Sequence, residues 1–158
     1  MASVIYMPII NDKVRKDFYD VLANVECDPI NYVAIGIQDI VSQHSTSLMS
    51  NQDWQEHFTT NQYAPYDPLR RAVLNSSRNI ICFADLDCGD NLGMEIMAKR
   101  ASFGMRNGLV VISRKHGYNL LLTLATDYNK FETKDFLEKH SKKISTLFID
   151  LANAILSS

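Results

Sequence analysis

The chain has 158 residues, 46% of them hydrophobic, and a formal net charge of −2. This length favours a single domain over residues 1–158, and the apolar content is high enough for a buried core, which excludes a disordered chain. Lysines and arginines are spread along the sequence, so we expect no direct binding of nucleic acid. No apolar run approaches the roughly 20 residues of a membrane-spanning helix, so no membrane association is expected.

Cys27, Cys82 and Cys88 are an odd number of cysteines with no secretory signal ahead of them. Reduced thiols in a cytoplasmic protein are therefore expected. Neither these cysteines nor the scattered histidines have the spacing of zinc ligands, and the sequence contains no phosphate-binding loop. We predict no metal and no cofactor.

The first quarter of the chain predicts a helix followed by two strands. Asn11 is a good N-cap for a helix over residues 11–25, whose apolar side chains form a stripe on one face. Residues 31–40 are rich in β-branched and aromatic side chains, which is typical of a strand. The more polar segment Ser45–Met49 is predicted to be a second strand.

Three helices and a strand are predicted next. Gln52–Thr60 forms a short helix, and a second helix begins after Asp67, because aspartate is a favoured N-cap and the following proline suits the first helical position. That helix ends at about residue 75. A short buried strand over residues 79–84 and a helix over residues 91–103 follow, with Gly104 ending the helix.

The last third predicts a hairpin and a long helix. Strands over residues 109–114 and Tyr118–Thr126 are joined by a turn at 115–117, and Thr133–Leu156 keeps an apolar period typical of a helix. The element order predicts an α+β fold, an α/β/α sandwich around a central, mostly antiparallel sheet of about five strands. Such a sheet has a concave side on which a ligand can lie.

The terminal helix also bears on assembly. It carries more apolar surface than one face of a small sheet needs, at Ile144, Leu147, Phe148, Leu151 and Ile155. A homodimer through this helix is one interpretation, and packing of the whole stripe on its own sheet is the alternative.

The most informative motif pairs the only tryptophan, Trp54, with Asp67 thirteen residues later. An indole N–H only donates a hydrogen bond, and an ionised carboxylate only accepts one. Together on an apolar wall, the two side chains can hold a small amphipathic molecule by opposite ends of one amide or ester group. The alternative is that Trp54 is a core residue and Asp67 only a helix cap.

This spacing, together with the segment Phe-Gly-Met-Arg-Asn-Gly at 103–108, resembles the ligand-binding domain of LuxR-type quorum-sensing regulators over residues 14–156. The resemblance implies that Trp54 donates to the lactone carbonyl of an acyl-homoserine lactone. It implies that Asp67 accepts from the amide N–H of the same ligand. It also places the hydroxyl of Thr123 against the acyl chain.

Three positions depart from the family pattern. Ser50 stands where the family usually has a tyrosine, and Phe58 keeps an aromatic ring without the hydroxyl. Cys82, followed by Phe83, stands where the family usually has a second tryptophan. Smaller residues at Ser50 and Cys82 enlarge the headgroup end of the pocket. We therefore expect weak binding of standard acyl-homoserine lactones or a preference for another headgroup.

The resulting expectation is a sensor domain that binds an acyl-homoserine lactone or a related autoinducer in transcription regulation. The alternative is a ligand-independent protein that pairs with a full-length LuxR-type regulator and modulates it. Family members usually carry a helix-turn-helix domain after the sensor domain. If these 158 residues are the whole protein, binding to an operator through a recognition helix is not expected, and if they are one domain of a longer protein, the function is that of the parent regulator. We predict no enzyme and no catalytic residues, because the sequence contains no nucleophile or metalloprotease motif.

Overall fold

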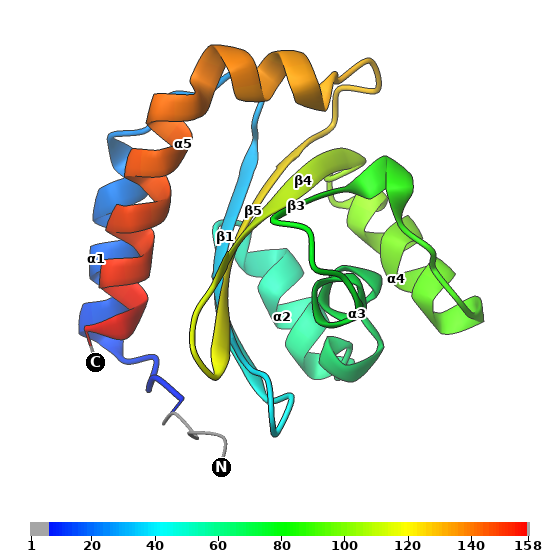
Figure 1. Ribbon diagram of the computed structural model, residues 1–158, viewed down its shortest axis with the longest axis horizontal. Helices are drawn as coiled ribbons and strands as arrows, with labels where there is room; N and C mark the ends of the chain where they lie inside the picture. Colours follow the sequence, from blue (N-terminus) through cyan, green and yellow to red (C-terminus); the bar gives the residue numbers. More distant parts are fainter. Residues whose placement is uncertain (1–6, 158) are drawn as a thin grey trace.

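An antiparallel five-stranded sheet with the order β2-β1-β5-β4-β3 forms the centre of the computed structural model, which describes residues 7–157 (Figure 1). Every pair of neighbouring strands is antiparallel. The strands are β1 Tyr32–Asp39, β2 Ser45–Met49, β3 Ile80–Cys82, β4 Asn107–Arg114 and β5 Tyr118–Thr126. The predicted antiparallel sheet is confirmed.

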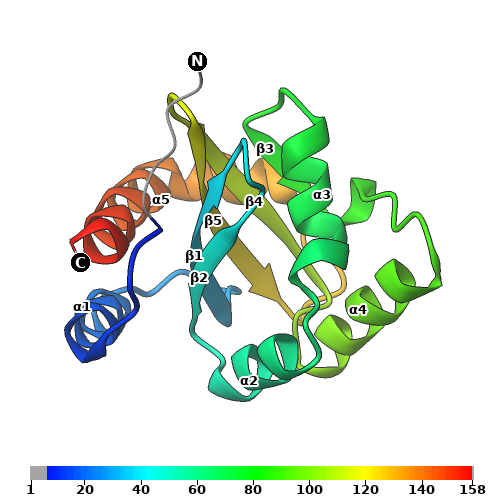
Figure 2. The same ribbon diagram turned by 90° about the horizontal axis from the view of Figure 1, so that it is seen from below.

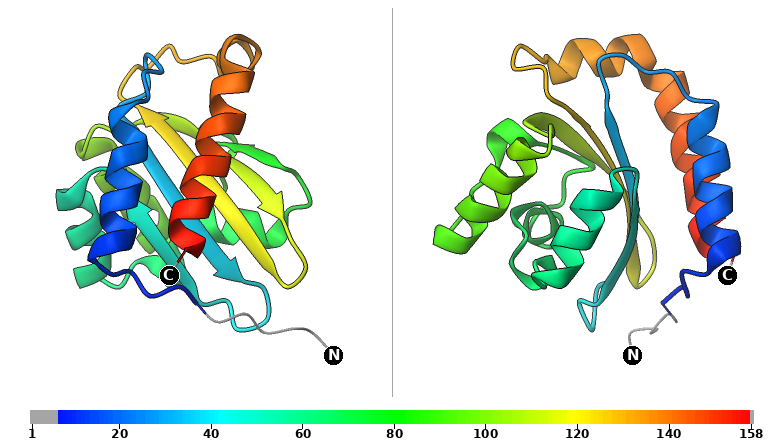
Figure 3. Two further views of the ribbon diagram at one scale, coloured as in Figure 1. Left: turned by 90° about the vertical axis from the view of Figure 1, so that its left-hand side faces the viewer. Right: turned by 180° about the vertical axis from the view of Figure 1, so that it is seen from behind.

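Helices cover both faces of this sheet. On the outer face, α1 and α5 lie side by side (Figure 3, left), while α2, α3 and α4 surround the concave face (Figure 2). The helices are α1 Asp12–Ala23, α2 Gln52–Thr60, α3 Pro68–Asn75, α4 Asn91–Ser102 and α5 Thr133–Leu156. The predicted α/β/α sandwich is therefore confirmed.

Strand alternation gives each face of the sheet its own core. On β1, Val33, Ile35 and Ile37 pack toward the layer of α1 and α5. Tyr32 and Ala34 pack on the concave side among residues of α2, α3 and α4. The concave core also contains most of the aromatic residues of the predicted site, so any ligand site built from them lies on this side.

Local sequence features fix the helix ends around this concave core. The side chain of Asp67 accepts from the backbone N–H of Leu69, and Pro68 holds the first helical position of α3, as predicted. Gly104 adopts a φ of 89° just past α4, and the backbone N–H of Met105 bonds the carbonyl of Arg100. This turn ends α4 as predicted and fixes the last turn of that helix over the sheet.

Most predicted ends agree with the structure to within one or two residues. The predicted strand over residues 79–84 is wrong beyond Cys82, because the strand stops there and Phe83–Asp85 forms a 3-10 turn. A further 3-10 turn, Ala64–Tyr66, precedes α3. The chain turns at Phe83–Asp85 after it leaves the sheet and at Ala64–Tyr66 after it leaves α2. A short apolar run in the sequence does not predict such a turn.

The apolar stripe of α5 is largely covered within the chain. Ile144, Leu147, Leu151 and Ile155 are buried against the sheet, while Ile149 is 61% exposed. Most of the apolar surface that suggested a dimer is therefore already buried within the single chain. Across residues 7–157, no helix combines the length and the apolar character needed to cross a membrane.

Candidate functional site

Asp67 lies at the junction between the 3-10 turn and α3, facing the concave side of the sheet. It is 2% exposed. Its Oδ1 accepts the backbone N–H of Leu69 at 3.1 Å, which caps the helix. The cap holds the carboxylate in a fixed position beneath α3, where water has little access.

The main partner of Asp67 is Arg100, in the last turn of α4. Nη1 of Arg100 lies 2.9 Å from Oδ1 and Nη2 lies 3.0 Å from Oδ2, which is a bidentate ion pair. The two side chains are 4% and 3% exposed. The sequence interpretation gave Asp67 a ligand amide N–H as its partner, and it did not foresee that each carboxylate oxygen accepts a guanidinium N–H of Arg100.

Charge and burial act in opposite directions on this pair. Burial alone would raise the pKa of Asp67, but the charge and hydrogen bonds of Arg100, with help from Arg70, hold it below its usual range. For Arg100, burial lowers the pKa, and the charge and hydrogen bonds of Asp67 outweigh this and raise it. Both groups therefore stay ionised in an almost dry site.

A pH dependence follows from this pair. The pKa of Asp67 is lower in the folded than in the unfolded state, so the stabilisation is fully present above about pH 4 and is lost as the pH falls through the folded-state pKa. We expect urea unfolding midpoints to drop below about pH 4. Asp67→Asn should flatten this drop, whereas the matched change Asp90→Asn, at the exposed cap of α4, should leave most of it. Equal flattening by both variants would contradict the assignment.

Arg70 brings a second positive charge from the first turn of α3. Its Nε lies 3.9 Å from Oδ2 of Asp67, its Nη2 donates to the hydroxyl of Ser47 at 3.1 Å, and its Cζ lies 5.0 Å from the ring centroid of Phe58. Only 15% of the side chain is exposed. Burial lowers the pKa of Arg70, and the charge of Arg100 adds to that effect, with Asp67 opposing it.

Trp54 is a second contact of Arg100. The Cζ of Arg100 is 5.2 Å from the indole centroid, within the range of a cation–π contact. The indole is 0% exposed and packs in an aromatic cluster with Phe58, Tyr63 and Phe103. Arg100 therefore contacts both residues that the sequence paired as a clamp.

Some buried donors around Arg100 have no acceptor. Among the described residues, Nε1 of Trp54, Nη1 of Arg70 and Nε of Arg100 are buried without a hydrogen-bond partner. Burial raises the pKa of the Tyr32 hydroxyl well above its usual value, and the nearby indole N–H of Trp54 acts weakly in the opposite direction. Unpaired buried donors are rare in native proteins, so this cluster needs an explanation.

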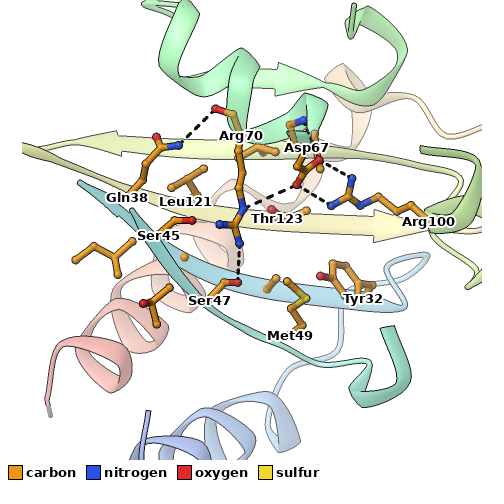
Figure 4. A pocket seen from close by; sticks show the side chains of 16 residues that line it. Tyr32, Gln38, Ser45, Ser47, Met49, Asp67, Arg70, Arg100, Leu121 and Thr123 are labelled. Atoms are coloured by element: carbon orange, nitrogen blue, oxygen red, sulfur yellow. Dashed lines mark hydrogen bonds and ion pairs between the residues drawn. The ribbon is translucent and has the colours of Figure 1, made fainter. Parts of the chain in front are cut away.

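A cavity of about 50 Å³ lies against these charged groups, and Figure 4 shows Asp67, Arg70 and Arg100 along one side of it. Its opposite wall is the concave face of the sheet, with Thr123 and Leu121 from β5 and Met49 from β2. A water molecule fits such a volume, whereas drug-sized ligands occupy about 300–1,000 Å³. Larger space therefore requires a side chain to move.

Arg70 lines both this cavity and a neighbouring hollow. The hollow has a volume of about 390 Å³ and is also lined by Met49, Phe58 and Pro65. Ser45, Thr46 and Ser47 line both spaces, so the two adjoin each other.

Of the residues that the sequence proposed for the site, Asp67 and Thr123 line the cavity. Phe58 lines the neighbouring hollow, and Trp54 and Phe83 are buried in the surrounding concave core. The structure brings these five to one side of the sheet.

Ser50 and Cys82 have other roles. The hydroxyl of Ser50 accepts the backbone N–H of Val33 at 2.9 Å and so ties β2 to β1. Cys82 follows the buried Ile81 on β3, so its side chain points to the opposite face, where it lines a hollow with Phe131 and Leu137. Neither position enlarges the cavity in the way that the sequence comparison implied.

Arg70 and Arg100 are functional candidates that the sequence interpretation missed. Arg100 follows the buried Ile96 by four residues, so it stands on the apolar stripe of α4, where a cation calls for a partner. No such pattern marks Arg70. Across residues 7–157, no group of three or more His, Cys, Asp or Glu side chains could hold a metal ion.

Comparison with known proteins identifies one family. The family model described as the autoinducer binding domain matches residues 21–155. Among curated proteins, no sequence matches this chain.

Three solved structures share the fold at low sequence identity. The LuxR-family factor CepR2 from Burkholderia cenocepacia, described as N-acylhomoserine lactone dependent, is 16% identical with a TM-score of 0.60, covering 91% of this chain and 94% of its own. The ligand-binding domain of VqsR from Pseudomonas aeruginosa is 12% identical with a TM-score of 0.62, covering 90% and 92%. Escherichia coli SdiA is 11% identical with a TM-score of 0.65, and the match covers 93% of this chain and 62% of SdiA. SdiA has also been solved in complex with octanoyl-rac-glycerol.

Proposed function

Because the chain belongs to the autoinducer-binding domain family, we propose that it binds a small amphipathic signal molecule and acts as a quorum-sensing sensor domain in LuxR-type transcription regulation. The ligand lies between the sheet and α2, α3 and α4. The observation that carries this proposal is the buried Asp67–Arg100 pair at the edge of a cavity, beside donors that lack acceptors. A bound ligand with oxygen acceptors would satisfy those donors.

The proposed contacts divide into a polar and an apolar end. Trp54, Arg70 and Arg100 supply donors, and Asp67 fixes the position of Arg100. Along the sheet, the cavity wall mixes apolar side chains, such as Met49 and Leu121, with hydroxyls, including that of Thr123, and the amide of Gln38. SdiA, a structural neighbour, has been solved with octanoyl-rac-glycerol, which combines an acyl chain with an oxygen-rich head. A ligand of that general shape suits this division.

Standard acyl-homoserine lactones are expected to bind weakly. The amide N–H of such a ligand needs an acceptor, and Asp67 already accepts from Leu69 and Arg100 at Oδ1 and from Arg100 at Oδ2, which leaves one lone pair of Oδ2 to share with a ligand. Sharing an oxygen between the guanidinium and the amide weakens both bonds, and displacing Arg100 leaves a buried charge without its partner. The ligand and Arg100 would thus compete for the same carboxylate.

The test is mass spectrometry of small molecules released from the purified protein by denaturation. We expect an amphipathic molecule from the expression host or from a culture of the native source. Asp67→Asn should lose it, because this variant keeps the helix cap but weakens the hold on Arg100. If neither the protein nor a screen of acyl compounds by thermal shift gives a ligand, the sensor function fails.

A second candidate function is a ligand-independent protein that pairs with a LuxR-type regulator. The observation that favours it is the small cavity, since Arg100 and the aromatic cluster fill much of the space that a signal molecule needs. Absence of any ligand, combined with co-purification of a full-length regulator, would support this candidate over the first.

The proposed function also includes dimer formation and a cytoplasmic location. A homodimer, or a heterodimer with a regulator, would use the outer layer, where Ile149 on α5 is 61% exposed. Light scattering at high protein concentration tests the homodimer, and a monomer would count against it. A cytoplasmic location is supported by Cys27, Cys82 and Cys88, which are all free thiols.

A further inference from the structure

The cavity beside Asp67 carries an excess of positive charge. Of the 16 residues that line it, Arg70 and Arg100 are cations and Asp67 is the anion. Their side chains are 15%, 4% and 3% exposed. With the Asp67–Arg100 pair neutral as a unit, one positive charge remains unbalanced among the described residues that line the cavity, since Arg70 shares the same carboxylate at 3.9 Å.

That excess charge belongs to Arg70. Arg100 holds both carboxylate oxygens at hydrogen-bond distance, whereas the nearest approach of Arg70 to Asp67 is 3.9 Å. The shortest bond of the Arg70 guanidinium is to a neutral hydroxyl, that of Ser47. A buried charge without a close partner is costly, and proteins usually retain one where a ligand or partner supplies the opposite charge.

The hydrogen-bonding groups point to the same kind of ligand. A guanidinium is planar and presents its donors in a fixed fork. With Nε toward Asp67 and Nη2 on Ser47, Nη1 of Arg70 projects away from both and has no acceptor (Figure 4). Nε of Arg100 and Nε1 of Trp54 also lack acceptors. A ligand that fits these described side chains must therefore supply hydrogen-bond acceptors.

We infer that the ligand of this domain is an amphipathic carboxylate, whose carboxylate pairs with Arg70 and whose apolar part lies in the adjoining hollow. The inference rests on the proposed ligand-binding function. A carboxylate can accept two parallel N–H groups of Arg70 in place of the hydroxyl of Ser47. It brings the net charge of the three ionised side chains and the ligand to zero.

The adjoining hollow has the size and surface for the apolar part. Its volume is about 390 Å³, and next to Arg70 it is lined by Met49, Phe58 and Pro65 together with polar side chains that include Gln55 and Gln62. This volume lies within the ~300–1,000 Å³ of typical ligand sites. A chain of about eight carbons attached to a carboxylate would therefore reach Arg70 from the hollow without displacing Arg100.

The test compares matched acids and neutral compounds by titration calorimetry on the intact chain. The pairs are octanoate against methyl octanoate, and ring-opened N-octanoyl homoserine against N-octanoyl homoserine lactone. We expect each acid to bind roughly 10- to 100-fold more tightly than its neutral counterpart, as for one charge-assisted contact. The difference should shrink as salt is raised.

Variants assign the preference to one side chain. Arg70→Met keeps the apolar length and should abolish the preference for acids, and Arg70→Lys should retain part of it. Arg106→Met is the matched control, since Arg106 is 56% exposed and pairs with Asp127 far from the cavity. Circular dichroism of each variant verifies the fold before titration.

The outcomes separate the carboxylate inference from the proposed sensor function. If the lactone or the ester binds as tightly as its acid, the carboxylate inference is overturned and the sensor function stands. If the preference for acids survives in Arg70→Met, the assignment to Arg70 is overturned. If none of the four compounds binds the wild-type chain, the carboxylate inference fails, and the mass-spectrometric search then decides the sensor function separately.

Discussion

Arg100→Met is expected to destabilise the protein by about 3–5 kcal/mol, because it leaves the carboxylate of Asp67 buried without its partner. Methionine keeps the length and most of the packing of the arginine stem, so the loss reports mainly on charge. For a domain of this size, such a loss lowers the melting temperature by roughly 6–20 °C. Urea unfolding followed by circular dichroism measures it.

Two comparisons isolate the ion pair. Arg106→Met breaks an exposed pair with Asp127 and should change stability by less than about 1 kcal/mol. The double variant Arg100→Met with Asp67→Asn should be more stable than Arg100→Met alone, because a neutral amide replaces the unpaired charge and still caps α3. If Arg100→Met is no more harmful than the Arg106 control, the buried pair is not a major contributor to the fold.

The size of this effect links stability to ligand recognition. Asp67 is at once the cap of α3 and the partner of Arg100 on α4, so it joins two helices over the concave face. A ligand that bonded Asp67 alone would disturb that junction. A ligand that bonds Arg70 leaves the junction of α3 and α4 intact. Arg70 is therefore the expected ligand contact, and the Asp67–Arg100 pair has a structural role.

The fold was predictable because its signals are local. Asn11 and Asp67 cap the helices that follow them, and alternation of side chains marks the long strands. The hairpin between β4 and β5 turns at Gly117, whose φ of 89° favours glycine. The three-residue strand β3 was less predictable, because its end is decided by how the chain turns at Phe83 and not by its own apolar pattern.

The candidate site was only partly predictable. The motif identified Asp67 and Thr123, which line the cavity, and Trp54, which lies in the core beside it. The pairing of Asp67 with Arg100 joins residues 33 positions apart on different helices, and no local period encodes such a contact. The sequence signal for this pairing was a charged residue, Arg100, on the buried apolar stripe of α4.

The departures from the family pattern need the structure for their interpretation. Size alone predicted that Ser50 and Cys82 would widen the pocket. Ser50 instead uses its hydroxyl to bond the backbone of Val33, and the pleat of β3 turns Cys82 to the other face of the sheet. The size of the cavity depends instead on Arg70 and Arg100, which line it and lie outside the motif positions.

Trp54→Ala is expected to cost about 3–5 kcal/mol in unfolding free energy, because the indole is 0% exposed and contacts Phe58, Tyr63 and Phe103 at the centre of the concave core. Trp54→Phe keeps an aromatic ring beneath Arg100 and should cost much less. Chemical unfolding measures both losses, and equal losses would contradict the packing role.

The phenylalanine variant also tests whether the indole N–H serves a ligand. Nε1 of Trp54 is buried without a well-placed acceptor in the described part of the chain, with the Tyr32 hydroxyl as its polar neighbour, so its removal should cost the unliganded protein little hydrogen bonding. If a ligand oxygen accepts from that N–H, Trp54→Phe weakens binding of ring-opened N-octanoyl homoserine roughly 10-fold by calorimetry, at little expense in stability. Unchanged affinity would mean that Trp54 contributes a wall and a cation–π surface to Arg100, and that the donors which recognise the ligand are those of the arginines.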